Sequence, residues 1–238
     1  MANDYFRFKQ FTVEQANTAM KVCTDACLFG AWISSFVNKD AGRLLDIGAG
    51  TGLLSLMLAQ KTSCKIDAVE LDDSAASDAV KNFECSPWSE RLHVFRGSIQ
   101  SFENVAPYDV IISNPPFFNN DLESPDKKRN LALHNTSLSL RELFCYVEQN
   151  LNSEGIFGLL VAARRDQEVL ALANEMKLIV ETRVGVKQTP AHAIFRYMYV
   201  LSKGPGSNVE EGEITIKDSQ GNYTGHFTSL LKEYYLQL

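Results

Sequence analysis

Apolar runs that predict strands alternate along most of the chain with segments that predict helices. Short runs bounded by polar or turn-forming residues predict buried strands at 43–47, 65–69, 91–95, 108–113 and 155–162. Between them, apolar or amphipathic segments predict helices at 53–59, from Asp73 or Ser74 to about Phe83, and at 138–151 and 166–176. Two further strands near 178–186 and 194–201 are separated only by a turn, which predicts an antiparallel hairpin at one edge of a sheet.

This order of elements is typical of an α/β protein. Strands joined through helices form βαβ crossovers, which give a mostly parallel sheet with helices on both faces. A chain of 238 residues is long enough to bury one such core and to carry short additions at both ends. A break at 203–208 is followed by a small predicted strand at 214–216 and by a terminal helix, whose apolar face we expect to dock on the core.

Composition favours a cytoplasmic protein that acts without a membrane. The chain has no apolar stretch long enough to span a bilayer, and residues 1–11 lack the apolar segment of a signal peptide. The five cysteines are an odd, scattered set, which favours reduced thiols over disulfides or a metal site. A net charge of −6 works against a general nucleic-acid binder, so local cations become the candidate phosphate contacts, at 127–129, 164–165, 183, 187 and 196. No obligate protein partner is evident from the sequence.

The stretch from Asp46 to Gly52 has the sequence of a ligand-binding turn between the first strand and the first helix. Its glycines stand at 48, 50 and 52, where they allow a sharp turn and a close approach of the backbone to a ligand. Leu53 occupies the position where a dinucleotide-binding fingerprint has its third glycine, which points away from NAD. Glu70 ends the second strand, where a carboxylate can accept hydrogen bonds from two ribose hydroxyls.

A second candidate site, Asn114-Pro115-Pro116-Phe117, follows the predicted strand at 108–113. Neither proline can donate a backbone hydrogen bond, and Pro115 keeps Asn114 out of helical geometry, so the strand ends in a stiff corner. Open α/β sheets bind their ligands at this end of their strands. The Asn114 amide oxygen and the backbone carbonyls can accept both hydrogens of a planar amino group, while Phe117 can stack on the ring that carries it.

Together these motifs resemble the signature of class I S-adenosylmethionine-dependent methyltransferases of the amino-methylating branch. Further runs at 8–11, 20–32, 137–140 and 216–224, with His134 and Tyr234-Tyr235, resemble the bacterial tRNA1(Val) (adenine-37-N6)-methyltransferases over nearly the whole chain. The resemblance implies a Rossmann-like, seven-stranded, mostly parallel sheet with helices on both faces and an antiparallel last hairpin, as the strand pattern also indicates. It further implies S-adenosyl-L-methionine as cofactor, tRNA as partner, no metal, and direct methyl transfer to the adenine amino group.

The resemblance assigns roles by position. An N-terminal extension at 1–40 would pack on the cofactor site, 41–203 would form the cofactor-binding core, and 204–238 would be a strand and helix extension of the same domain. The catalytic assignments are Asn114, Pro115, Pro116 and Phe117. The cofactor contacts are Thr24, Asp25, Asp46, Gly48, Gly50, Gly52, Glu70, Leu71, Ser98, Ile99 and Asn114, with Ser98 standing where many relatives have aspartate. The substrate contacts are Phe117, Phe118, Lys127, Lys128, Arg129 and His134.

The Asn-Pro-Pro-Phe motif alone leaves other substrates open. Guanine N2 in rRNA and the side-chain nitrogen of a protein glutamine would use the same acceptor geometry, and a DNA adenine is a third alternative. Relatives with these substrates usually carry an added domain or a target-recognition region, for which this chain leaves little room. A methyltransferase fold that only binds cofactor or RNA is a further alternative, disfavoured by the intact Asp46, Glu70 and Asn114.

Overall fold

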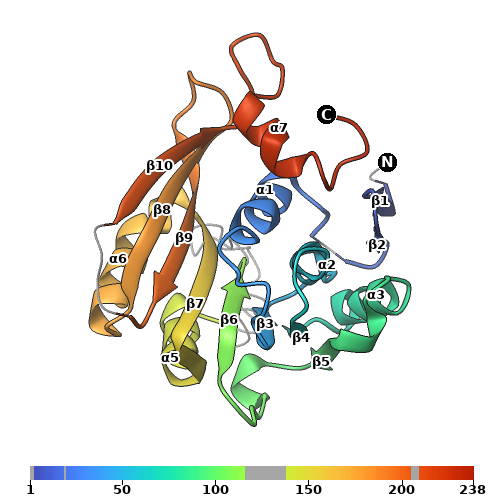
Figure 1. Ribbon diagram of the computed structural model, residues 1–238, viewed down its shortest axis with the longest axis vertical. Coiled ribbons are helices and arrows are strands. Elements are labelled where there is room, and N and C mark those ends of the chain that lie inside the picture. The colour runs from blue at the N-terminus through green and yellow to red at the C-terminus, as the bar shows by residue number, and fades with distance from the viewer. Residues whose placement is uncertain (1–2, 19, 116–137, 205–208) are drawn as a thin grey trace, which may run out of the picture.

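A mixed sheet of eight strands runs through the molecule (Figure 1). The computed structural model describes residues 3–18, 20–115, 138–204 and 209–238. The strands of the sheet are β3 (Arg43–Ile47), β4 (Lys65–Glu70), β5 (Leu92–Arg96), β6 (Tyr108–Ser113), β7 (Leu151–Ala162), β8 (Ile179–Lys187), β9 (Ile194–Ser202) and β10 (Glu210–Thr215). They lie in the order β10-β8-β9-β7-β6-β3-β4-β5, and all run parallel except β9, which is antiparallel to both of its neighbours.

The predicted α/β fold is confirmed, with one strand more in the sheet than expected. The hairpin of β8 and β9 is present, but it does not form the edge, because β10 pairs with β8 outside it. The first four residues of β10 are exposed, so no apolar run marks this segment as a strand of the main sheet. Backbone pairing holds it instead, together with ion pairs of 2.8 Å from Arg183 to Glu211 and from Lys187 to Glu213.

Helices cover both faces of the sheet (Figure 1). One face carries α1 (Thr24–Ile33), α2 (Leu53–Ala59), α3 (Asp73–Glu84) and α7 (Gly225–Leu231), and the other carries α5 (Leu140–Asn150) and α6 (Asp166–Glu175). Short 3₁₀ turns lie at Ser89–Arg91, Ile99–Ser101 and Ala163–Arg165. Buried side chains form one cluster on each face, so the sheet is covered on both sides, as its apolar strands predicted.

Helix starts follow ordinary capping chemistry. Asp72 caps α3 by accepting a hydrogen bond from the Ala75 amide at 2.8 Å, so the cap lies before both predicted positions, Asp73 and Ser74. Ser139 begins α5 with a capping box, in which its side chain and that of Glu142 bond each other's backbone amides. Helix α1 does not show in the sequence periodicity, because every residue after its first is buried and no polar face creates a helical pattern.

The two ends of the described chain pack together (Figure 1). Strands β1 (Tyr5–Arg7) and β2 (Thr12–Glu14) form a separate antiparallel hairpin, and Phe8 beside them makes an isolated bridge with Tyr235. The rings of Phe8 and Phe11 stack at 4.5 Å within the cluster beneath α1, α2 and α7. All five cysteines are free thiols. Across the described residues, no helix has the length and apolar character needed to cross a membrane.

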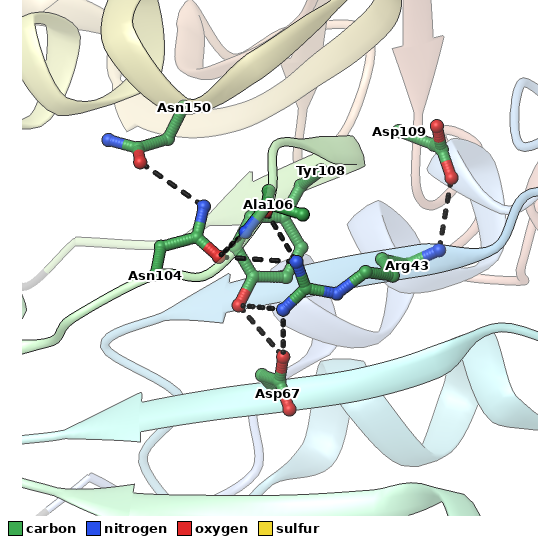
Figure 2. A network of polar contacts seen from close by, with 7 residues as sticks. All are labelled: Arg43, Asp67, Asn104, Ala106, Tyr108, Asp109 and Asn150. Carbon is green, nitrogen blue, oxygen red and sulfur yellow. Dashed lines mark hydrogen bonds and ion pairs between the residues drawn. The ribbon is translucent and has the colours of Figure 1, made fainter.

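A polar network closes the amino-terminal edge of the sheet (Figure 2). Arg43, the first residue of β3, pairs with Asp67 of β4 at 3.0 Å, and its guanidinium lies 4.2 Å from the centre of the Tyr108 ring. The Tyr108 hydroxyl donates to Asp67 at 2.8 Å and accepts from Arg43 at 3.0 Å. Burial and the neighbouring Asp67 carboxylate raise the pKa of Tyr108 well above its usual value, so the hydroxyl stays protonated. The network ties β3, β4 and β6 together at the edge opposite the candidate site.

Candidate active site

Predicted site residues from four segments meet at the carboxyl edge of the sheet. Strands β5, β4, β3 and β6 are parallel neighbours, so the residues that follow them lie along one edge. Hydrogen bonds join these strand ends: the Gly48 amide donates to the Val69 carbonyl at 2.9 Å, and the Gly97 amide donates to the Glu70 carbonyl at 2.8 Å. The fold therefore brings the glycine turn, Glu70, the 97–99 segment and Asn114 to one place.

All three glycines of the turn after β3 have the left-handed backbone conformation. Their φ angles are 73° at Gly48, 57° at Gly50 and 78° at Gly52. Such angles cost other residues roughly 1–2 kcal/mol. A Cβ atom at Gly48 or Gly50 would meet no atom within 4 Å, so the backbone there faces open space that a ligand can enter. A Cβ atom at Gly52 would lie 2.4 Å from the Phe83 ring, so this third glycine is required by the packing of α3.

The carboxyl group of Asp46 is buried, and only one of its two oxygens accepts a hydrogen bond within the described residues. It lies on β3 with no exposed surface, and its Oδ2 accepts a hydrogen bond from the Ser55 hydroxyl at 2.7 Å. Its Oδ1 has no partner among the described residues. Burial raises the pKa of Asp46 to about 7 against the opposing effect of the Ser55 hydrogen bond, and the charge of Glu70 adds to the rise. A buried acceptor without a donor fits a cationic group or N–H group of a ligand.

Glu70 ties the glycine turn to the end of β4. Its Oε2 accepts from the Gly50 amide at 2.7 Å, and its Oε1 accepts from the Asp72 amide at 2.8 Å. An ionised carboxylate has about four lone-pair positions, so two remain for ligand hydroxyls. Leu71 next to it is 50% exposed and presents an apolar surface at the same edge.

The segment after β5 offers fewer side-chain groups than predicted. The Ser98 hydroxyl donates to the Ser101 hydroxyl at 3.1 Å and retains acceptor capacity. Ile99 is buried in the core cluster on the α5 and α6 face, so its backbone rather than its side chain is available to a ligand. The roles assigned to these two residues remain predictions.

Asn114 begins the corner after β6. The preceding Ser113 is anchored by its hydroxyl, which donates to the Ile47 carbonyl of β3 at 2.8 Å. The side-chain Oδ1 of Asn114 is buried and has no hydrogen-bond partner among the described residues, and Pro115 is buried beside it. The other predicted residues of this loop lie outside the described residues: Pro116, Phe117, Phe118, Lys127, Lys128, Arg129 and His134.

Thr24 and Asp25 open α1 at the same edge of the sheet. Asp25 is buried, and its Oδ2 accepts from Arg196 Nε at 2.8 Å. Arg196 lies opposite Ala162, the last residue of β7, so this ion pair stands at the carboxyl end of the strand next to β6. Three other candidate phosphate contacts are also paired with carboxylates at 2.8–2.9 Å: Arg165, Arg183 and Lys187.

Two residues that hold the site together are absent from the sequence-based predictions. Ser55 binds the Asp46 carboxylate, and its signal in the sequence is that it is the polar residue in the otherwise apolar run at 53–59. Asn82 of α3 donates to the Thr51 carbonyl in the glycine turn at 2.9 Å. Its position in a helix gives no sign of this contact, because the partner lies 31 residues earlier in the chain.

Comparison with known proteins identifies the family. A family model described as "Methyltransferase small domain" matches residues 30–189. Proteins named tRNA1(Val) (adenine(37)-N6)-methyltransferase are similar over the full length. That of Flavobacterium johnsoniae is 39% identical over 236 residues, covering 98% of this chain and 100% of the relative. That of Dyadobacter fermentans is 41% identical over 239 residues, covering 99% of this chain and 98% of the relative.

A solved structure supports the same fold. It is described as a predicted O-methyltransferase from Agrobacterium tumefaciens, and it matches with a TM-score of 0.66 over 88% of this chain and 96% of its own. Its sequence is 16% identical, so this likeness concerns the fold alone. The extent and identity of the sequence matches show that the chain belongs to the tRNA1(Val) (adenine(37)-N6)-methyltransferase family.

Proposed function

We propose that this protein transfers a methyl group from S-adenosylmethionine to the exocyclic amino group of adenine 37 in a valine tRNA, the activity named for its relatives. One observation carries the proposal: two buried side-chain oxygens at the carboxyl ends of neighbouring strands, Asp46 Oδ1 and Asn114 Oδ1, have no hydrogen-bond donor within the described parts of the chain. A methyl transfer to an amino group can use two such acceptors. One would hold the cofactor's ammonium group, and the other would hold the target amino group.

The residues at the ends of β3 and β4 fit the cofactor. Asp46 offers a carboxylate oxygen to the ammonium group, and the open backbone at Gly48 and Gly50 leaves room for the amino-acid part. Glu70 has lone pairs left for the two ribose hydroxyls. When bound, S-adenosylmethionine supplies a methyl group activated by a positively charged sulfur.

Asn114 and Pro115 have the groups to prepare the target nitrogen. The lone pair of an exocyclic amino nitrogen is delocalised into its ring, which makes the nitrogen a poor nucleophile. Asn114 Oδ1 and the Pro115 carbonyl would accept its two N–H groups and favour a pyramidal nitrogen with the lone pair free to attack. Removing one acceptor of this kind costs on the order of 10²–10³ in rate at comparable sites. The nitrogen loses its extra proton after transfer, so a dedicated base is unnecessary.

The RNA substrate must present its base outside the stack. Bases in tRNA loops leave their stack at low cost, and a flipped base can then be read by stacking and by hydrogen bonds to its edge. Phe117 and Phe118 would stack on or cover the base, and the cations at 127–129, with His134, would contact nearby phosphates. A protein of net charge −6 with few such contacts should bind tRNA weakly and with marked salt dependence.

We also infer that residues 41–203 form the cofactor-binding core and that 1–40 and 204–238 are extensions of the same domain. The bonds of Asn82 to Glu14 and the pairing of β10 with β8 support this division, because each joins one extension to the core. A cytoplasmic location follows from a tRNA substrate and agrees with five free cysteines.

The substrate class can be tested with methyl-labelled S-adenosylmethionine. The purified protein and its Asn114→Ala variant are incubated with total tRNA, rRNA, DNA or protein extract, and labelled nucleosides are identified by chromatography. The proposal predicts label in tRNA as N6-methyladenosine and its loss in the variant. Label in guanosine, or in glutamine of a protein, would retain the cofactor and overturn the substrate.

A further inference from the structure

The side-chain amide of Asn82 joins two segments that are distant in sequence. It lies on α3 and is 2% exposed. Its Nδ2 donates to the Thr51 carbonyl and to the Glu14 carbonyl, both at 2.9 Å, and its Oδ1 accepts from the Glu14 amide at 2.7 Å. Three of the amide's four hydrogen-bonding positions are thus used, and the pattern fixes which end is oxygen and which is nitrogen.

The first partner of Asn82 lies inside the glycine turn. Thr51 stands between Gly50 and Gly52, and it is buried. The Gly50 amide on one side of Thr51 donates to Glu70, the predicted ribose ligand, at 2.7 Å. Holding the Thr51 carbonyl therefore fixes the middle of a turn whose backbone has unusual φ angles, in addition to the hydrogen bonds that the amides of its three glycines donate.

The second partner of Asn82, Glu14, is connected to the segment before α1. Glu14 ends β2, and the next residue, Gln15, is buried and accepts a hydrogen bond from the Val22 amide at 2.7 Å. Val22 stands two residues before Thr24, where α1 begins and where two of the predicted cofactor contacts, Thr24 and Asp25, lie. One buried amide thus anchors both the glycine turn and the N-terminal segment that reaches the other side of the site.

We propose that Asn82 is a positioning residue for cofactor binding, which sets the glycine turn and the N-terminal segment in the arrangement that S-adenosylmethionine requires. This inference rests on the proposed function, because it presumes that the glycine turn binds this cofactor. Asn82 itself is separated from the open side of the turn by the buried Thr51, so it acts through that turn and does not touch the ligand.

Asp78 provides a matched control on the same helix. It lies one turn before Asn82 and is 1% exposed. Within the described part of the chain, its carboxylate accepts from the Asn17 amide at 3.1 Å and from the Asn17 side chain at 2.8 Å. It therefore anchors the N-terminal segment much as Asn82 does, but its bonds do not reach the glycine turn.

The test compares Asn82→Ala with Asp78→Ala by calorimetric binding of S-adenosylhomocysteine, with urea unfolding of each variant alongside. Asn82→Ala should weaken binding about tenfold, the effect of one hydrogen bond of roughly 1.4 kcal/mol. Asp78→Ala should weaken it less than about threefold despite a comparable loss of stability. Amide hydrogen exchange at Gly50 and Gly52 should speed up in the first variant alone.

Equal weakening in both variants would overturn the proposal, because Asn82 would then act only by holding the N-terminal segment. Unchanged binding in Asn82→Ala would overturn it as well. If that variant does not fold, Asn82→Asp gives the same comparison, since it keeps the shape and the acceptor for the Glu14 amide but loses both donated bonds. A wild-type protein that fails to bind S-adenosylhomocysteine would instead refute the proposed function.

Discussion

Cofactor affinity should rise steeply with pH up to about 7, because Asp46 must lose a proton before it can hold an ammonium group. Burial raises the pKa of this carboxyl group to about 7, from an ordinary value of about 3.9. Below that pH the group is neutral, and a neutral acid attracts the positively charged amino-acid part of the cofactor far less than a carboxylate does. Above it, the carboxylate is already formed and no further gain is expected.

The magnitude follows from proton linkage. If binding requires the loss of one proton, the association constant changes about tenfold per pH unit below the pKa, which is about 1.4 kcal/mol per unit. We therefore expect affinity to rise about tenfold between pH 5.5 and 6.5 and to level off above about 7. The same raised pKa affects the stability of the ligand-free protein in the opposite direction. The folded state holds the proton more tightly than the unfolded state, so stability falls as pH rises from about 4 to about 7, by at most about 4 kcal/mol.

The assay is calorimetric titration with S-adenosylhomocysteine over a pH range of about 5.5 to 7.5, in two buffers of different ionisation enthalpy that report proton release. Asp46→Asn is the control, since it keeps the shape and cannot ionise. Wild-type protein should release close to one proton at the low end of the range, and the variant should show a flat, weak affinity. A flat wild-type profile, or an equal slope in Asp46→Asn, would refute this reasoning. If the dependence of affinity on pH disappeared in Glu70→Gln and not in Asp46→Asn, the proton released on binding would come from Glu70.

Two stability predictions use urea unfolding. Gly52→Ala should lower the free energy of unfolding by about 1–3 kcal/mol more than Gly50→Ala does. Both variants lose a left-handed glycine, but only the first forces a Cβ atom against the Phe83 ring. Equal losses of stability would show that this ring moves aside. Tyr108→Phe should lower the free energy of unfolding by about 1–3 kcal/mol, since it removes the hydroxyl's hydrogen bonds to the charged Asp67 and Arg43, which keep their own ion pair. It should leave binding of S-adenosylhomocysteine unchanged, because Tyr108 lies at the opposite edge of the sheet. Weakened binding in that variant would contradict the separation of the two edges.

Much of the fold could be predicted from the sequence because its central strands β3, β6 and β7 are largely buried on both faces and read as apolar runs. The elements that were missed lack that signal for identifiable reasons. Helix α1 is buried nearly all round and shows no amphipathic period. Of strand β10 only the end was predicted, as a small strand at 214–216, because the rest is rich in exposed glutamate and is held by backbone pairing and ion pairs with β8. The short hairpin of β1 and β2 depends on packing against the C-terminal segment, a contact between opposite ends of the chain.

The candidate site also contains residues that the sequence indicates and contacts that it does not. Asp46, the glycines and Glu70 could be proposed from sequence because the ends of parallel strands and turn-forming residues have recognisable local patterns. Their supporting contacts could not, because these join residues far apart in the chain: 31 positions between Asn82 and Thr51, and 171 between Arg196 and Asp25. The structure also shows a desolvation cost that the sequence pattern does not indicate. The Asp46 carboxyl group is buried, and one of its oxygens has no donor in the described structure.

The position of the methyl group on a valine tRNA is the most direct test of the proposed function. A transcript with adenine at position 37 and one with guanine there are each incubated with wild-type protein or Asn114→Ala, and modified nucleosides are mapped along the strand. The account predicts N6-methyladenosine at position 37 of the first transcript with wild-type protein, no product with the second, and a rate lower by about 10²–10³ in the variant. Methylation at another position, or full activity in Asn114→Ala, would contradict it.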